Sequence, residues 1–147
     1  ICDVLHSKID VKVNCIEDLE KGVKEADVVS CATLSATPLI FGSWLKPGHH
    51  IDLVGAYKPD MREADNELML KSKIFVDTPL ALKESGDLKI PLKEGVLDVN
   101  DIRGNLFQLC QRIRKGREKK EDVTVFKSVG HALEDLVAAK MVHNVHG

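Results

Sequence analysis

Apolar residues along the chain follow two patterns, short continuous runs and longer stretches with helical spacing. Nearly continuous runs at 27–33 and 50–56 predict buried strands, because strands of a parallel sheet are covered on both faces, and 73–77 predicts another strand. Shorter runs at 11–15 and 124–126 predict two further strands. The segments between the strands are long enough for crossover connections, which favours parallel pairing.

Apolar residues three and four positions apart predict helices in the intervening segments. This spacing occurs at 16–26, 61–70, 102–113 and 129–145. A short helix is expected at 79–82, since proline is tolerated in a first turn, whereas 86–95, with its glycine and proline, is expected to be a loop. The last helix is expected to bury a stripe that includes Leu133, Leu136 and Val137. Strands that alternate with helices predict an α/β fold with a mostly parallel sheet.

The composition is that of one soluble domain, with 147 residues, 44% hydrophobic residues, 30% charged residues and a formal net charge of -2. It excludes a disordered chain, and the lack of an apolar run of ~18 residues excludes a membrane span. The basic run at 112–122 has acidic neighbours and no interleaved aromatic residue, which favours an exposed helix end and loop over a nucleic-acid site. We therefore expect a cytoplasmic protein with no nucleic-acid or membrane partner.

Cysteine and histidine residues indicate neither a disulfide framework nor a metal site. The four cysteines are far apart and form no CxxC pair, so free buried thiols are expected. The six histidines show none of the ligand spacings that zinc prefers, and no metal site is expected.

Ligands of an open parallel sheet bind beyond the carboxyl ends of its strands, which selects three segments here. Hydroxyl groups at 33–35 can bond a ribose or a phosphate. In 54–59, Gly55 leaves the backbone accessible to a flat ring. In 127–130, backbone amides and the Ser128 hydroxyl precede the last helix, a position that suits an anion or a polar ring substituent.

Each of these segments also has a purely structural explanation. Ser128 would then cap the last helix, Gly55 would allow tight packing, and Thr33 would end a strand. The acidic residues Glu63 and Asp65 are expected to act as helix caps and dipole partners rather than in catalysis. The chain has no GxGxxG motif and no recognisable catalytic triad, so the residues alone identify no catalytic group.

Four segments together resemble the ornithine cyclodeaminase/mu-crystallin family. They are ADVVSCATLSATPLI at 26–40, LKPGHHIDLVGAYKPDMREAD at 45–65, IFVDT with ALKESGDL at 74–88, and TVFKSVGHALEDLVAAK at 124–140. Within the family, GHHIDLVGAYKPDMRE resembles the ketimine reductase branch, which includes the pyrroline-2-carboxylate reductases. The resemblance covers nearly the whole chain.

The resemblance implies a Rossmann-type domain that binds NAD(H) or NADP(H), within a longer protein that is usually a homodimer. In this family the glycine-rich phosphate loop precedes the region that matches. Residues 1–147 are therefore expected to form the C-terminal part of the dinucleotide-binding domain with a closing helix, incomplete at its N-terminus. The substrate and dimerisation domain is expected to be absent, and this chain alone to be inactive.

Residue by residue, the resemblance implies contacts to the cofactor and, at Lys58, to the substrate carboxylate. The cofactor residues are Thr33, Val54, Gly55, Ala56, Tyr57 and Ser128. Cyclodeaminases carry an aspartate where this chain has Tyr57, and tyrosine carries no negative charge at neutral pH.

These residues favour an NAD(P)H-dependent reductase of cyclic imino acids, acting on a small-molecule substrate. An ornithine cyclodeaminase or an alanine dehydrogenase is the alternative within the family. A further alternative is a non-catalytic protein that binds NADPH or another small ligand.

Overall fold

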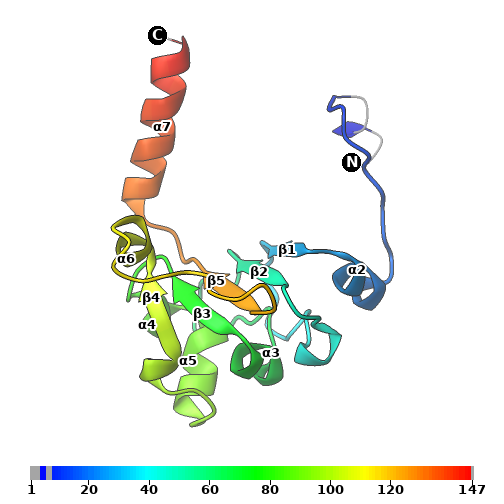
Figure 1. The fold of residues 1–147 in the computed structure, drawn as a ribbon, viewed down its shortest axis with the longest axis vertical. Helices are drawn as coiled ribbons and strands as arrows, with labels where there is room; N and C mark the ends of the chain where they lie inside the picture. The colour runs from blue at the N-terminus through cyan, green and yellow to red at the C-terminus, as the bar shows by residue number, and fades with distance from the viewer. Residues whose placement is uncertain (1–3, 6–7, 147) are drawn as a thin grey trace.

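A computed structural model describes residues 4, 5 and 8–146, the side chain of His146 excepted. Its centre is a five-stranded sheet in the order β1-β2-β5-β3-β4, in which every pair is parallel (Figure 1). The strands are β1 (Val28–Cys31), β2 (His50–Leu53), β3 (Lys73–Val76), β4 (Ile102–Asn105) and β5 (Thr124–Lys127). The prediction of an α/β fold with a parallel sheet is confirmed.

The helices connect these strands and close the chain. They are α2 (Leu19–Glu25), α3 (Asn66–Lys71), α4 (Ala81–Glu84), α5 (Gly86–Lys93), α6 (Leu106–Cys110) and α7 (Ala132–His146), with 3-10 turns η1 (Gly42–Trp44) and η2 (Val99–Asp101). Asp65 caps α3, since its carboxylate accepts a hydrogen bond from Leu68 N at 2.8 Å, as expected for an acidic residue at that place.

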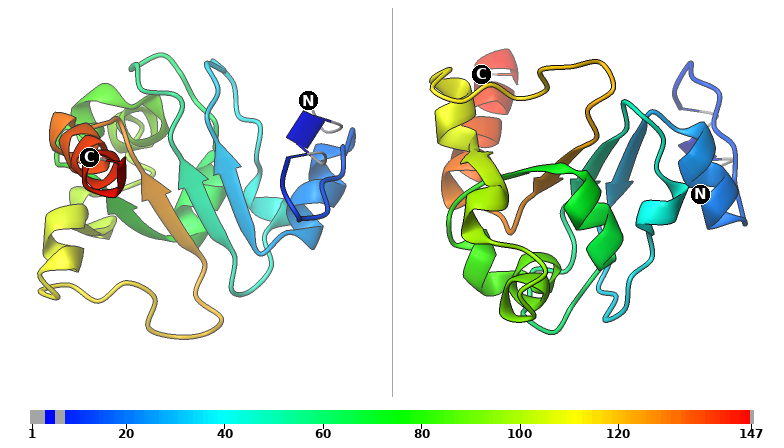
Figure 2. Two further views of the ribbon diagram at one scale, coloured as in Figure 1. Left: turned by 90° about the horizontal axis from the view of Figure 1, so that it is seen from above. Right: turned by 60° about the horizontal axis from the view of Figure 1, so that its bottom comes forward.

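The core lies between the sheet and the helices on one side of it, which Figure 1 shows below the strands. Alternate residues of the strands contribute fully or almost fully buried side chains, as do α3 and α5; these are Ile51, Leu53, Ile74, Val76 and Val125 with Leu68, Met69 and Leu88. Seen from above, no helix of the described part covers β1, β2 and β5 (Figure 2). Val28 is accordingly 61% exposed, and the prediction that its strand is buried on both faces was wrong.

Two segments adopt structures that the apolar pattern did not predict. The predicted loop at 86–95 contains α5, because Ser85 caps the helix by accepting from Asp87 N at 3.3 Å and the helix packs Leu88 into the core. The predicted helix at 102–113 divides into β4 and α6 at Asn105, whose side chain accepts from Gln108 N at 3.0 Å. In addition, 11–15 forms no strand.

Helix α7 projects from the rest of the molecule (Figure 1). Its expected buried stripe is exposed, with Leu133 at 45% and Leu136 and Val137 each at 51%, so that prediction was wrong. An apolar groove of about 530 Å³ runs between α7 and α6 and includes Phe107 and Met141 in its walls.

The cysteines meet the expectation of free buried thiols only in part. Cys31 is free and buried, Cys110 is free but exposed, and Cys15 is disulfide-bonded. Among the described residues, no group of three or more His, Cys, Asp or Glu side chains could hold a metal ion, and no helix has the length and apolar character needed to span a membrane.

Candidate functional site

The three segments predicted from the strand ends lie at one edge of the sheet. Thr33 follows β1, residues 54–58 follow β2 and Ser128 follows β5, and these three strands are neighbours. The backbone joins the segments directly: Ala56 N donates to Thr33 O at 3.0 Å, and Ser128 N donates to Leu53 O at 3.0 Å. The structure therefore brings the predicted cofactor residues together.

Gly55 is buried in this turn and needs to be glycine. A side chain there would place its Cβ 2.2 Å from both Thr33 O and Glu63 Oε1, distances that no real contact allows. The tight-packing explanation for Gly55 is therefore confirmed. The expectation that Gly55 leaves its backbone accessible to a flat ring was wrong, because the residue is buried and protein atoms fill the space beside its Cα. Its contact with the cofactor stays a prediction.

Ala56 has an unusual backbone conformation, with φ at 47°, in the left-handed region that favours glycine. Its side chain is fully buried, its N–H bonds Thr33 O, and its carbonyl accepts from Ser85 Oγ at 3.0 Å. A non-glycine residue in this region costs about 1–2 kcal/mol, which these surrounding contacts offset. Strain of this kind is concentrated at functional sites.

The other predicted residues of the turn face solvent. Val54 and Tyr57 are each 45% exposed, and Lys58 is exposed with its Nζ 5.8 Å from the centre of the Tyr57 ring. An apolar group, a phenol and an ammonium thus stand together at the open edge of the sheet, where a ligand can reach them.

A buried group of charged side chains, Glu63, Asp87 and Lys127, lies beneath the turn, and the sequence did not predict it. The prediction that Glu63 acts as a helix cap was wrong, because Asp65 caps α3 and Glu63 bonds Thr33 N instead. All three are fully buried. Lys127 Nζ donates a hydrogen bond to Gly55 O and lies 3.4 Å from Asp87 Oδ2. Glu63 Oε1 accepts from Thr33 N at 2.6 Å. The cluster therefore ties the backbone after β1 and β2 to the end of β5.

Within this buried cluster the carboxylates are only partly satisfied. Asp87 Oδ1 accepts from the backbone N–H groups of Glu63 and Ala64, at 2.8 and 3.0 Å, whereas Asp87 Oδ2 and Glu63 Oε2 accept no hydrogen bond from the described residues. Burial raises the pKa of Asp87. Burial also lowers the pKa of Lys127, against the opposing effect of Asp87 and Glu63. The attraction between Asp87 and Lys127 favours the charged form of each and so opposes the effect of burial on both pKa values.

Asp77 holds the segment after β5 in a similar way. Its fully buried carboxylate accepts from Ser128 Oγ at 3.0 Å, Val129 N at 2.7 Å and Gly130 N at 2.9 Å through Oδ2. Because α7 begins only at Ala132 and Ser128 bonds Asp77, the alternative that Ser128 caps the last helix was wrong.

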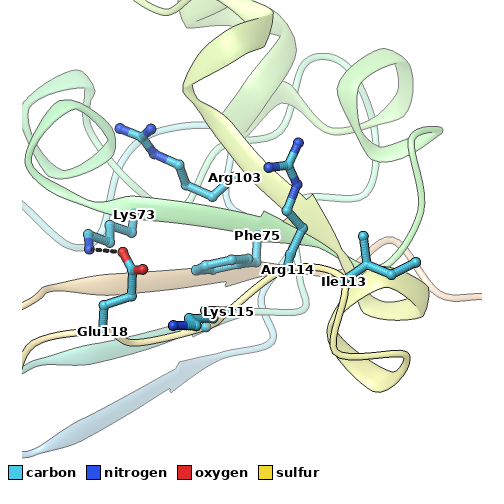
Figure 3. Close-up of a pocket in the computed structure, with 8 residues that line it drawn as sticks. Lys73, Phe75, Arg103, Ile113, Arg114, Lys115 and Glu118 are labelled. Atoms are coloured by element: carbon cyan, nitrogen blue, oxygen red, sulfur yellow. Dashed lines mark hydrogen bonds and ion pairs between the residues drawn. The ribbon is translucent and has the colours of Figure 1, made fainter.

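A cavity of about 380 Å³ lies elsewhere in the structure and contains none of the predicted site residues (Figure 3). Basic side chains dominate its walls, among them Arg103, Arg114 and Lys115. Lys73 pairs there with Glu118 at 3.2 Å and with Asp122 at 2.8 Å, and the hydrogen bond from Lys73 lowers the pKa of Asp122 to about 2. The run at 112–122 follows the end of α6 as an exposed loop, as predicted.

Comparison with known proteins confirms the family resemblance over almost the entire chain. The model of the ornithine cyclodeaminase/mu-crystallin family matches residues 2–146. The ketimine reductase mu-crystallin of Mus musculus is 40% identical over 139 residues, which are 94% of this chain and 42% of that protein.

Solved structures show the same fold. The Δ1-pyrroline-2-carboxylate reductase of Thermococcus litoralis, in complex with NADH and L-proline, superposes with a TM-score of 0.91 at 36% identity, over 97% of this chain and 45% of that one. An archaeal alanine dehydrogenase dimer with bound NAD gives 0.84 at 29% identity, over 96% and 44%.

This chain therefore spans less than half the length of these relatives. The sheet and its connections are of the Rossmann type, as predicted. The chain belongs to the ornithine cyclodeaminase/mu-crystallin family.

Proposed function

We propose that this chain forms the nicotinamide-binding edge of an NAD(P)H-dependent reductase of cyclic imino acids such as 1-pyrroline-2-carboxylate. The observation that carries the proposal is the exposed Tyr57 in the turn after β2, beside Lys58. This position supplies no carboxylate, whereas proton transfer in the cyclodeaminases of the family relies on an aspartate there. The similarity to a pyrroline-2-carboxylate reductase supports the same choice.

The residues at this edge fit a nicotinamide. Val54 offers an exposed apolar side chain to a ring face, and Ser128 offers a hydroxyl to a polar ring substituent. When bound, the nicotinamide would supply the hydride for reduction of a C=N bond. The protein's own part is to hold the ring: the turn at 54–57 is fixed from below by Lys127, and Ser128 is fixed by Asp77.

Lys58 is the proposed partner of the substrate carboxylate. Its ammonium is exposed at the open edge and makes no ion pair with the described residues. A charge-assisted hydrogen bond to a carboxylate would orient an imino acid over the turn. No residue of this chain is assigned as a proton donor.

The rest of the active site belongs, in this proposal, to a further domain of a longer cytoplasmic protein that forms a homodimer. The relatives are more than twice as long as this chain, and the archaeal alanine dehydrogenase is described as a dimer. The exposed apolar side of α7 is the kind of surface that such packing buries.

The test is the oxidation of NADH and of NADPH by the complete gene product with 1-pyrroline-2-carboxylate, assayed in parallel with ammonia release from ornithine and with reductive amination of pyruvate. Imine-dependent oxidation alone supports the reductase. Ammonia and proline from ornithine, or alanine from pyruvate, would replace it with the other activities of the family. Cofactor binding without any turnover would instead favour a ligand-binding protein.

A further inference from the structure

We propose that Asp77 is a positioning residue that makes Ser128 an obligate hydrogen-bond acceptor toward the cofactor, and that the site thereby selects a ring substituent with an N–H group. This inference rests on the proposed function, since it concerns how that site recognises a nicotinamide.

The direction of each hydrogen bond follows from counting donors around Asp77. Three backbone N–H groups point at its carboxylate: Thr78 N reaches Oδ1 at 2.6 Å, and Val129 N and Gly130 N reach Oδ2 at 2.7 and 2.9 Å. A backbone N–H can only donate, and a carboxylate can only accept. The proton in the 3.0 Å contact between Ser128 Oγ and Asp77 Oδ2 therefore comes from Ser128.

Ser128 is left with acceptor capacity only. A hydroxyl has one proton and two lone pairs. The proton goes to Asp77, and one lone pair receives the N–H of Gly130 at 3.1 Å. The remaining lone pair can accept one further hydrogen bond, and the hydroxyl has nothing left to donate. A ligand group at this hydroxyl must therefore be a donor.

The surroundings keep this arrangement from reversing. Asp77 is fully buried, and Ser128 is 8% exposed, so solvent does not readily replace either partner. The same carboxylate also fixes the backbone of Val129 and Gly130, which prevents Ser128 from turning away. The carboxamide of a nicotinamide carries both a C=O acceptor and an NH2 donor, and Ser128 would accept from the NH2. This contact would fix which way the carboxamide faces.

The experiment compares three dinucleotides on the complete protein by equilibrium titration. NADH carries the carboxamide, the reduced thionicotinamide analogue keeps the NH2 group, and the reduced 3-acetylpyridine analogue replaces it with a methyl group. The wild type should bind the acetylpyridine analogue at least about fivefold more weakly than the other two, because one hydrogen bond is lost. Equal binding of all three would overturn the proposal.

Variants then test the part played by Asp77. Ser128→Ala should bind the three dinucleotides with nearly equal affinity. In Asp77→Ala the Ser128 hydroxyl loses its acceptor and can donate outward, so the preference for an NH2 group should shrink or reverse. Adding Asp77→Ala to Ser128→Ala should leave the ratio unchanged. A uniform loss of affinity in Asp77→Ala with the wild-type ratio would show that Asp77 only supports the loop, and would overturn the proposal.

A neutron structure of the wild type makes the test independent of how the variants fold. Deuterium between Ser128 Oγ and Asp77 Oδ2 agrees with the proposal, and deuterium on Ser128 directed away from Asp77 contradicts it. A wild type that binds none of the dinucleotides refutes the proposed function instead, so the two failures are distinguishable.

Discussion

Lys127 at the end of β5 donates a hydrogen bond from its buried ammonium to the carbonyl of Gly55, in the turn after β2. The contact joins two strand ends that are neighbours in the sheet but far apart in the chain. The backbone proposed to lie under the nicotinamide is thus held by a charge inside the protein, while Val54 and Tyr57 of the same turn are exposed.

Replacement of Lys127 by methionine should destabilise the protein by about 3–5 kcal/mol, because it leaves the carboxylates of Asp87 and Glu63 buried without their cation. Urea unfolding of the complete protein measures this loss. Lys24→Met is the matched control, since Lys24 pairs with Glu20 at the surface, where both side chains are about half exposed, and its loss should cost at most about 1 kcal/mol. Equal effects of the two substitutions would show that the buried cluster contributes no more to the free energy of unfolding than a surface ion pair.

Gly55→Ala should destabilise the protein by about 3 kcal/mol, because the new Cβ would collide with the backbone of Thr33. The contrasting substitution is Gly22→Ala in α2, where a Cβ would lie 3.5 Å or more from the Ile16 side chain. Alanine is the better helix former, and Gly22→Ala should stabilise by about 0.5–1 kcal/mol. Thermal unfolding compares both, and a stable Gly55→Ala protein that still binds NADH would contradict the packing described for the turn.

Tyr57→Asp should leave the fold intact, since the side chain is 45% exposed and stability changes by no more than about 0.5 kcal/mol at such sites. The introduced carboxylate should repel a substrate carboxylate and lower kcat/KM for the imino acid by about tenfold. Circular dichroism checks the fold and steady-state kinetics the activity. Aggregation of the variant would place Tyr57 in the core, and unchanged kinetics would remove it from the substrate site.

His49 should make stability fall in mild acid. Its Nδ1 accepts from Lys46 N at 3.2 Å, so Nε2 carries the proton, and burial lowers the pKa of the imidazole from its usual 6.5. Because folding lowers the pKa of His49, the neutral imidazole stabilises the folded protein fully above pH 6.5. This contribution is lost as the pH falls through the pKa of His49 in the folded state. The unfolding free energy, measured from pH 7.5 to 5, should therefore decline. The decline should be smaller in His49→Gln. An identical slope of unfolding free energy against pH in the wild type and the variant would refute this role of His49.

The strand ends at Thr33, Gly55 and Ser128 could be predicted from the sequence, because a parallel sheet brings all its carboxyl ends to one edge. The support beneath them could not. Asp77 and Lys127 stand within or beside apolar runs and have no local spacing that marks a partner, and their contacts depend on the sheet order.

Two errors in the predicted elements arise because local sequence patterns do not encode tertiary contacts. Helix α5 was hidden by Gly86 and Pro91, which mark loops in isolation, and it is stabilised here by tertiary burial of Leu88. The apolar stripe of α7 correctly marks a helix, but periodicity does not say what covers it, and no described residue buries Leu136.

A crystal structure of the complete protein with NADH and L-proline would test the proposed cofactor site most directly. We expect the nicotinamide ring against the turn at 54–57, its carboxamide nitrogen within hydrogen-bond distance of Ser128 Oγ, and the proline carboxylate near Lys58. A dinucleotide bound away from the carboxyl ends of β1, β2 and β5 would refute the proposed site.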